Sequence, residues 1–297
     1  MSADMARILM YHNFAATKEE CPDAVTVNDV RKQLAYLRGH FRVLPVTRLV
    51  EQLKSGTAIE KNTVALTVDD GRRNFCQFFF PLLKEFRMPA TFFVVSSFIS
   101  GNDWIWTDKV LWLARQPLAH EELRQDKLDH FFEKMNRLRP DIRNSQIDEV
   151  AAKMQVSIPK EPPPEYAPCS WTQLREMADS GLVEIGSHSV THPIFSTLSD
   201  EESRWELAES RTQIEQLLGR SVSSFCFPNG KPADYFPRHL RQVKEVGYSS
   251  AMMTHFGMPR RGANEYGLPR LGVSGRMDML SFMKYVDGVE YYQALLR

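Results

Sequence analysis

The sequence predicts an α/β protein in which seven or eight strand–helix units form a parallel sheet or a closed barrel. Three observations support this prediction. Apolar strand patterns alternate with helical patterns along most of the 297-residue chain, which is long enough for one large α/β domain or two small ones. Two strand patterns lead directly into chemically active side chains, at residues 69–70 and 188–192. Parallel strands bring such side chains together at the carboxyl edge of a sheet.

Composition narrows the class of protein. Hydrophobic residues make up 43% and charged residues 25% of the chain, as in ordinary globular proteins, and 37 basic residues balance 37 acidic ones. This balance gives no reason to expect binding to nucleic acid or to an anionic membrane surface. The first ten residues lack a secretion signal, no window resembles a membrane span, and the cysteines are scattered. We therefore expect a reduced, cytoplasmic protein without a membrane span.

Strand and helix patterns alternate through the first hundred residues. Strands are expected at 8–11, 41–46, 63–68 and 89–98, and helices at 27–39, 46–54 and 74–86. Gly39 provides a stop for the first helix, and the second is expected to end near Gly56. Pro81 either kinks or restarts the third helix. The run at 89–98 is nearly unbroken apolar sequence, which is typical of a strand covered on both faces.

The alternation breaks between about residues 101 and 169. Trp104, Trp106 and Trp112 open this stretch, a charge-rich helical part follows, and three prolines at 162–164 close it. We interpret it as a helical insertion within a single domain that covers residues 1–297. Two interpretations of its role stay open: a wall of the substrate cleft, or a solvated helical hairpin without a role in binding.

Regular alternation then resumes. Ser170 with Gln173, and Ser199 with Glu202, have the spacing of capping boxes at helix starts. Gly219 is expected to end the second of these helices. Another helix pattern closes at 243–247, and strands are expected at 182–185, 225–227, 249–253 and 268–273.

Two adjacent carboxylates end the strand at 63–68. Asp69 and Asp70 lie where the chain turns, so both can face one cleft. Two carboxylates this close raise each other's pKa unless a cation separates them. One is therefore expected to hold a metal ion while the other acts as a base. On these residues alone, a simple turn is the alternative interpretation.

A histidine pair supplies the ligands that the carboxylates lack. His188 and His192 follow a strand pattern with a spacing that puts two imidazoles on one face of a helical turn. Two imidazoles and one carboxylate form an open three-ligand site, with room for water and a substrate oxygen. Such a site suits amide or ester hydrolysis, because the metal polarises the carbonyl and a second carboxylate takes the proton of the attacking water.

The same stretches resemble a known family. Residues 67–71 (TVDDG), 188–193 (HSVTHP) and 227–230 (FPNG), in this order and spacing, are similar to the motifs of the polysaccharide deacetylase family, also called NodB-homology or carbohydrate esterase family 4. The resemblance covers nearly the whole chain apart from the insertion. It implies a distorted (β/α)7 barrel.

The resemblance also implies roles for individual residues. Asp69 would be the general base, and Asp70, His188 and His192 would bind the metal, most often zinc. The backbone N–H of Asn229 would help to hold the oxyanion of the tetrahedral intermediate.

Two positions depart from the family pattern. The family's third motif begins with an arginine that orients the base, whereas this chain has Cys226 there, and we predict that Arg270 replaces it. The late Leu-x-His motif that supplies the general acid is absent. The opening Leu-Met-Tyr-His at 9–12 resembles poly-N-acetylglucosamine deacetylases, whose acid is an early histidine, so His12 is the predicted acid and His255 the alternative.

Further residues are expected to contact substrate. Arg72 and Arg73 follow the acidic pair and suit a phosphate or carboxylate on the substrate. A role in holding Asp69, or a simple solvated pair, is the alternative for these two arginines. Pro228 and Arg270 complete the predicted substrate-binding set.

The predicted function is a metal-dependent N-deacetylase acting on an acetamido sugar. Because the sequence shows no export signal, the expected substrate is a nucleotide-linked, lipid-linked or small glycan intermediate inside the cell. An N-formyl sugar deformylase would use the same chemistry. A hypothesis from another class is a non-catalytic sugar-binding protein on a degenerate barrel.

Overall fold

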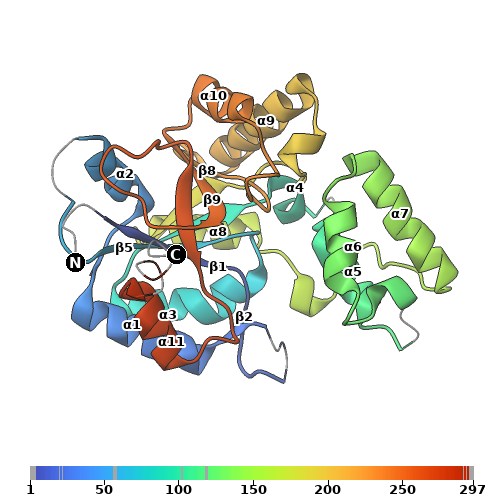
Figure 1. Ribbon diagram of the computed structural model, residues 1–297, viewed down its shortest axis with the longest axis horizontal. Helices are drawn as coiled ribbons and strands as arrows, with labels where there is room; N and C mark the ends of the chain where they lie inside the picture. Colours follow the sequence, from blue (N-terminus) through green and yellow to red (C-terminus); the bar gives the residue numbers. More distant parts are fainter. Residues whose placement is uncertain are drawn as a thin grey trace.

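The computed structural model describes residues 5–19, 21, 23–55, 59–101, 103–117, 120–289, 291 and 293. Seven parallel strands close into a barrel in the order β1-β10-β9-β8-β7-β6-β5, and β5 pairs back with β1 (Figure 1). These strands are β1 (Arg7–Tyr11), β5 (Thr63–Val68), β6 (Ala90–Val94), β7 (Val183–Ser187), β8 (Ser224–Cys226), β9 (Ser250–Phe256) and β10 (Leu268–Gly272). The predicted (β/α)7 barrel is therefore confirmed.

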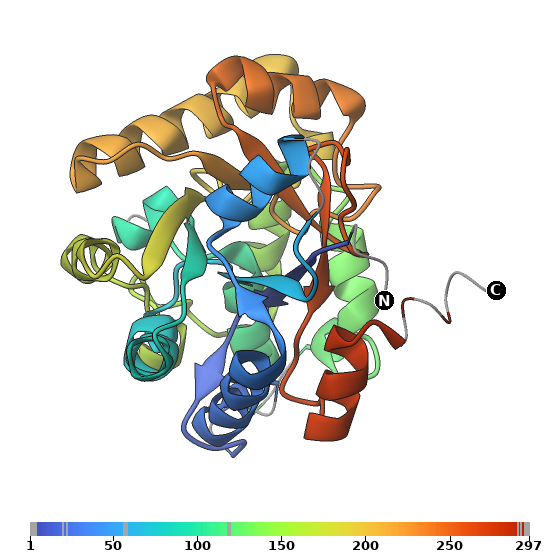
Figure 2. The ribbon, with the colours of Figure 1, turned by 90° about the vertical axis from the view of Figure 1, so that its left-hand side faces the viewer.

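Helices surround the barrel, as Figure 2 shows. They are α1 (Val27–His40), α2 (Val46–Lys54), η1 (Phe75–Phe79), α3 (Phe80–Phe86), α8 (Trp171–Asp179), α9 (Asp200–Leu218), α10 (Pro237–Val246) and α11 (Met279–Val286). Both predicted capping boxes form, at Ser170 and at Ser199, and Gly219 ends α9 in a left-handed conformation. The capping signals in the sequence thus predicted the starts of α8 and α9 and the end of α9 correctly.

Several predicted elements are wrong in length. The strand expected at 89–98 ends at Val94, and the short helix α4 (Ser96–Ile99) follows it, because the chain must turn at the edge of the barrel. The strand expected at 41–46 is reduced to β4 (Arg42–Val43), which pairs only with β5. Pro81 stands in the first turn of α3, after the π-helical turn η1, and so restarts the helix. Gly56 lies outside the described residues.

The register of β5 sets the position of the site. All six residues of β5 are buried, and Tyr11 of β1 pairs with Val68 of β5, so His12 and Asp69 leave the sheet at the same level. On the other side of β5, β6 is its neighbour, and Val94 at the end of β6 pairs with Ser187 at the end of β7. The carboxyl ends of these strands therefore bring their following residues to one edge.

The insertion forms a helical unit beside the barrel (Figure 1). It contains α5 (Trp106–Ala114), η2 (Glu121–Leu123), α6 (Leu128–Met135), α7 (Pro140–Lys153) and η3 (Pro164–Tyr166). Buried apolar side chains from α5, α6 and α7 form a cluster separate from the barrel's own clusters. The insertion rejoins the barrel through an antiparallel bridge between Arg72 and Pro168 and a hydrogen bond from the Cys169 N–H to the Gly71 carbonyl (2.9 Å).

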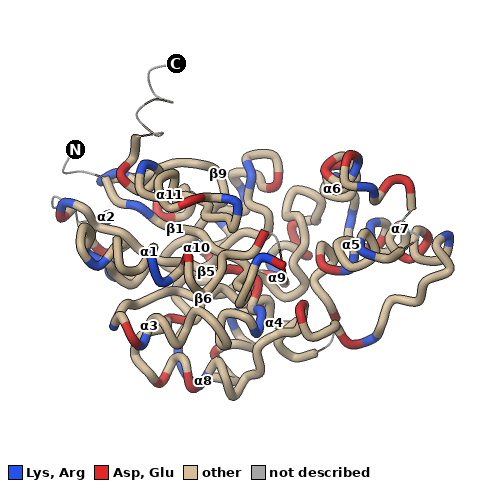
Figure 3. Tube along the Cα trace, turned by 90° about the horizontal axis from the view of Figure 1, so that it is seen from below, with Lys and Arg blue, Asp and Glu red and all other residues tan. Residues whose placement is uncertain are grey.

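Charged residues of both signs are spread along the chain trace. Basic and acidic positions both occur on the barrel helices and on the insertion (Figure 3). Within the described part of the chain, no helix has both the length and the apolar character that a bilayer crossing requires.

Candidate active site

A cleft of about 720 Å³ lies at the carboxyl ends of the barrel strands. Asp69, Asp70, His188 and His192 all contribute to its wall. Its remaining lining residues are Met10, His12, Asn13, Arg72, Trp106, Thr107, Asp129, Phe132, Asn136, Asn229, Lys231, Thr254 and His255. The cleft thus unites side chains that are more than two hundred positions apart in the sequence.

The turn after β5 explains how two neighbouring carboxylates face one cleft. Asp70 has a φ of 81° and Gly71 a φ of 96°, so the chain reverses immediately after Asp69. Left-handed backbone is costly for a residue other than glycine and concentrates at functional sites. A Cβ atom at Gly71 would lie 2.8 Å from Cδ1 of Ile99, the end of a flexible side chain, so the positive φ is the main reason for glycine at this position.

Asp70, His188 and His192 form a compact group of side chains that could hold a metal ion. The Nε2 atoms of His188 and His192 each lie 3.6 Å from Oδ1 of Asp70, and the three ligand atoms are within 4.8 Å of one another. The Nδ1 atom of His188 is 2.7 Å from the carbonyl oxygen of Cys226. A hydrogen bond donated by Nδ1 to this carbonyl leaves Nε2 as the free lone pair, as in metal-binding histidines.

The loop that carries the histidines is held by Glu206 rather than by helical hydrogen bonds. The expected helical turn is not formed, because Ser189 and His192 have φ values of 71° and 58°. Glu206 Oε2 accepts the N–H groups of Val190 (2.7 Å) and Thr191 (3.0 Å), and Oε1 accepts the Thr191 hydroxyl. Glu206 was not predicted from the sequence, although a carboxylate on the buried face of α9 was a detectable signal.

The protonation states of these side chains suit a cation. Burial, together with the neighbouring His188, lowers the pKa of His192 to about 3, and burial also lowers the pKa of His188. Burial alone would raise the pKa of Asp70, but the Arg72 guanidinium outweighs it and leaves this pKa well below its usual range. Two neutral imidazoles and an ionised carboxylate are the forms that bind a metal. The residues present therefore fit a divalent metal, and zinc accepts this set of ligands.

Arg270 holds the Asp69 carboxylate from the interior of the barrel. Both side chains are almost fully buried, and the guanidinium binds both carboxylate oxygens, with Nη1 2.8 Å from Oδ1 and Nη2 2.6 Å from Oδ2. Burial would raise the pKa of Asp69, but Arg270 outweighs it and keeps this pKa below its ordinary value. Arg270 thus lies under the base rather than in the lining of the cleft, as the predicted replacement for the missing motif arginine requires.

Cys226 belongs to the same buried cluster. Its Sγ atom is 3.0 Å from Nη2 of Arg270 and 3.6 Å from Oδ2 of Asp69. Asp69, His188 and Cys226 also have ligand atoms within 4.8 Å of one another. A cation at this second group would meet the Arg270 guanidinium, so the group with Asp70 is the better metal site.

Arg72 connects the metal-ligand carboxylate to the insertion. Its Nη2 atom is 2.9 Å from Oδ2 of Asp70 and 2.8 Å from Oδ1 of Asp108, and all three side chains are buried. Burial raises the pKa of Asp108 to about 6 against the opposing effect of Arg72. Nothing in the sequence pattern marked Asp108, because it gains its role only when α5 packs beside the turn after β5.

Two histidines border the cleft near Asp69. His12 Nε2 is 3.8 Å from Oδ2 of Asp69, and the His12 side chain is 41% exposed. His255, at the end of β9, also lines the cleft, and burial lowers its pKa. Both predicted candidates for the general acid therefore reach the cleft.

The turn after β8 presents a backbone donor. Asn229 lines the cleft with a φ of 58°, and its side chain donates to Oδ2 of Asp234 (2.7 Å). In the described part of the chain, the Asn229 N–H donates to no protein acceptor. Pro228 is buried behind this turn and does not belong to the cleft lining.

The insertion forms one wall of the cleft. Trp106 and Thr107 come from α5, Phe132 comes from α6, and Asp129 and Asn136 lie at the ends of the same segment. Of the two interpretations of the insertion, the structure supports the one that places it beside the substrate cleft.

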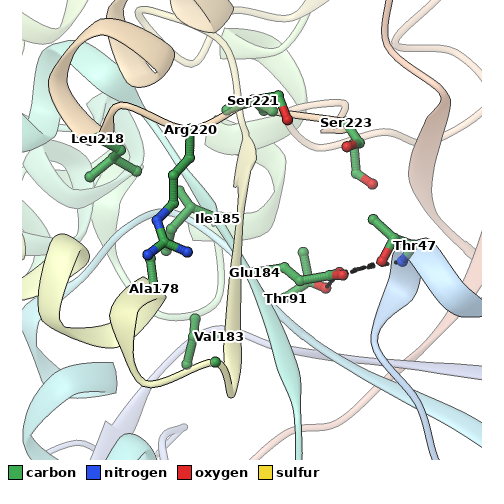
Figure 4. Close-up of a pocket in the computed structure, with 13 residues that line it drawn as sticks. Thr47, Thr91, Ala178, Val183, Glu184, Ile185, Leu218, Arg220, Ser221 and Ser223 are labelled. Carbon is green, nitrogen blue, oxygen red and sulfur yellow. Dashed lines mark hydrogen bonds between the residues drawn. The ribbon is translucent and has the colours of Figure 1, made fainter.

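Another pocket, of about 480 Å³, opens at the amino ends of β7 and β8 (Figure 4). Glu184 accepts hydrogen bonds there from the Thr47 side chain and N–H and from the Thr91 hydroxyl (2.9 Å), as Figure 4 shows. The two metal-ligand groups found among the described residues both lie at the opposite end of the barrel. The chemistry-bearing side chains thus gather at the carboxyl ends of the strands.

A parallel barrel with an open carboxylate–imidazole site and a spare carboxylate beside it defines a metal-dependent hydrolase class. The comparison with family models agrees: residues 57–251 match the model described as polysaccharide deacetylase. The match covers about two thirds of the chain, and the chain belongs to this family. His12 and Arg270 lie outside the matched range, so their place beside Asp69 comes from the structure.

Individual relatives are distant. The Bacillus subtilis protein YxkH, which is named as a polysaccharide deacetylase, is 25% identical over 118 residues, 40% of this chain and 41% of YxkH. The Escherichia coli poly-β-1,6-N-acetyl-D-glucosamine N-deacetylase is 28% identical over 96 residues, 31% of this chain and 14% of that protein. The matches therefore span less than half of either curated relative.

Solved structures share the fold over nearly the whole chain. The Streptococcus pyogenes deacetylase PplD in complex with acetate has a TM-score of 0.67 and 17% identity, and the alignment covers 96% of this chain and 99% of PplD. IcaB from Ammonifex degensii has a TM-score of 0.65 and 19% identity, with 96% of both chains covered.

Proposed function

We propose that the protein is a metal-dependent N-deacetylase that hydrolyses the acetamide of an amino sugar in a glycan. The observation that carries this proposal is the placement of Asp69 next to the group formed by Asp70, His188 and His192, in one cleft. Family membership supports hydrolysis of a sugar acetamide as the reaction. The intact set of ligands argues against the non-catalytic sugar-binding protein considered above.

Asp70, His188 and His192 hold the metal in this proposal, most suitably zinc. A divalent ion there supplies a Lewis acid that polarises the acetamide carbonyl and makes a water molecule more acidic. Asp69 removes a proton from the attacking water. Arg270 keeps Asp69 ionised and fixes both of its oxygens, so the base is ready without rearrangement.

The backbone of Asn229 stabilises developing charge. Its N–H points from a left-handed turn at the edge of the cleft and has no acceptor among the described residues. A preorganised N–H at this place can donate to the carbonyl oxygen as the amide carbon becomes tetrahedral.

His12 protonates the departing amine in this proposal. It lies 3.8 Å from Asp69, so the proton that the base removes has a short path to the leaving group. Burial lowers the pKa of His255 and so favours its neutral form, which is a poor acid. His12 is therefore the better candidate of the two.

An amine-release assay on acetylated and formylated amino sugars, combined with metal analysis, tests the proposal. We expect bound metal in proportion to protein, amine release from the acetylated sugar, and loss of release on chelation.

His12→Ala should lower turnover about 10²-fold or more, the usual contribution of a general acid, while metal binding persists. Full activity of His12→Ala with an inactive His255→Ala would reverse the assignment of the acid. Faster release of formate than of acetate would make the protein a deformylase.

A further inference from the structure

A further pocket, of about 290 Å³, lies directly beside the catalytic cleft. Asn13 and Arg72 line both spaces. The pocket forms where the insertion rejoins the barrel, and its lining includes Arg73, Arg115 and Tyr166. We call it the arginine pocket.

Two of its three guanidinium groups are free to bind an anion. Arg72 is neutralised by its ion pairs with Asp70 and Asp108. Arg73 Nη2 donates only to the Pro164 carbonyl (3.2 Å), and neither Arg73 nor Arg115 forms an ion pair with any residue that the structure describes. The positive charge of these two groups is thus available to a ligand.

Acidic side chains in the lining do not cancel this charge. Asp23 and Glu165 also line the pocket. Asp23 is already paired with Arg276 at 2.6 Å. Glu165 is then the remaining carboxylate in a lining that also contains the guanidinium groups of Arg73 and Arg115, so the lining keeps an excess positive charge.

Buried donors in the same wall lack acceptors. Tyr166 is 4% exposed, and its hydroxyl has no hydrogen-bond partner among the described residues; the Nε of Arg73 is also buried without one. Burial raises the pKa of Tyr166 to about 12, so the hydroxyl keeps its proton and can donate. The Arg115 guanidinium lies 5.6 Å from the centre of the Tyr166 ring. Buried donors are normally paired, so these indicate a missing acceptor.

Backbone hydrogen bonds fix the arrangement in advance. The Arg73 N–H donates to the Ala167 carbonyl (2.8 Å), and the Tyr166 N–H donates to the Pro163 carbonyl (2.9 Å). The backbone of Arg73 is therefore tied to the end of the insertion, and the turn that carries Tyr166 is closed before any ligand binds. A preformed site loses less free energy to ordering.

We propose that the arginine pocket binds an anionic group, a phosphate or a carboxylate, carried by the glycan substrate whose acetamide occupies the catalytic cleft. This inference rests on the proposed function, because it assigns the group to the substrate. Guanidinium groups bind both anions through paired hydrogen bonds, and a tyrosine hydroxyl adds a neutral donor. The shared wall at Asn13 and Arg72 places the two groups of one ligand side by side.

Equilibrium binding to the purified full-length chain tests the proposal without turnover. The probes are N-acetylglucosamine, its 1-phosphate, and N-acetylmuramic acid, which carries a carboxylate. We expect the wild type to bind at least one anionic sugar about tenfold or more tightly than the neutral one, because charged hydrogen bonds contribute on this scale. The phosphate and carboxylate probes distinguish the two sources of charge. The preference should decrease with added salt.

Variants connect the preference to the pocket. Arg73→Met with Arg115→Met should abolish it, and Tyr166→Phe should reduce it. Arg124→Met is the matched control, because Arg124 is an exposed arginine of the insertion that lines neither space, and it should leave the preference unchanged. If the double variant does not fold, Arg115→Met alone carries the test, since Arg115 is exposed.

Equal wild-type affinity for all three sugars would overturn the proposal, as would a preference that persists in the folded double variant. The two proposals can fail separately. A chain that prefers the anionic sugar but releases no amine from any substrate disproves the deacetylase assignment. A chain that releases amine without such a preference disproves the anion pocket alone.

Discussion

Asp69 and Asp70 are neighbours in the sequence but are supported by different regions of the molecule. Beneath Asp69 lies the interior of the barrel, where Arg270 from the last strand binds both carboxylate oxygens. Beside Asp70 lies the junction with the insertion, where Arg72 bridges to Asp108. Both carboxylates are buried and both have lowered pKa values. The barrel thus holds the proposed base, whereas the insertion helps to hold a proposed metal ligand.

The largest effect is expected when the carboxylate proposed as a metal ligand is removed. Asp70→Asn should lose the metal and all measurable turnover, because two imidazoles alone make a weak site. We expect the metal dissociation constant to rise by more than the about 10–100-fold that is typical of changes to outer-shell partners. Competition with a chromogenic chelator measures it. Unchanged metal affinity in Asp70→Asn would place the ion elsewhere.

Asp69→Asn separates the base from the ligand. The variant should bind metal as the wild type does, yet its turnover should fall by about 10²–10⁴-fold, the usual contribution of a positioned base. Metal content and amine release are measured on the same preparation. Loss of metal together with activity would show that Asp69 is itself a ligand.

Arg270→Met tests the support beneath the base through pH. Burial alone raises the pKa of Asp69, and Arg270 is the main opposing influence. Without Arg270 this pKa rises, so Asp69 stays protonated to a higher pH and the acidic limb of the kcat/KM profile should move upward. The buried carboxylate also loses its partner, which typically costs about 3–5 kcal/mol of stability.

A second variant distinguishes an effect of Arg270 on the Asp69 carboxylate from a general loss of protein stability. Cys226 lies 3.6 Å from Asp69, at the position where the family motif has arginine. Cys226→Arg combined with Arg270→Met should restore the acidic limb toward its wild-type position. An unshifted limb in folded Arg270→Met would contradict the role assigned to Arg270.

Asp108→Asn should have a smaller effect than Arg270→Met, and this effect should be confined to metal binding at Asp70. Arg72 keeps its contact with Asp70 but loses a partner, so we expect metal affinity to weaken by about tenfold, at the low end for an outer-shell change. The acidic limb governed by Asp69 should not move. Asp103→Asn is the control on the same insertion, because Asp103 is exposed and pairs with Lys109 instead of Arg72. An equal loss in both variants would mean that the insertion acts only through folding.

The sequence predicted the parts of the site that depend on residues close to one another along the chain. The strand at 63–68 was correct at both ends, because its apolar run is bounded by the acidic pair. The spacing of His188 and His192 predicted that they share a site, and the structure brings them together with Asp70. The loop between them was not predicted, since Glu206 holds it from a helix that begins eight residues after His192. Asp108 gave no signal, because its partner Arg72 becomes its neighbour only in the folded chain. The predicted cytoplasmic location stays a prediction.

The smallest effect is expected at the far end of the barrel. Glu184→Gln removes acceptor capacity for Thr47 and Thr91 in the pocket at the amino ends of the strands, far from both carboxylates. We expect a loss of about 1 kcal/mol in the free energy of unfolding, the net contribution of a typical hydrogen bond, with metal affinity and kcat/KM unchanged. Urea unfolding and amine release measure the two quantities. A change in kcat/KM would mean that this end of the barrel is coupled to the cleft, and that the supports of Asp69 and Asp70 extend beyond the neighbours described above.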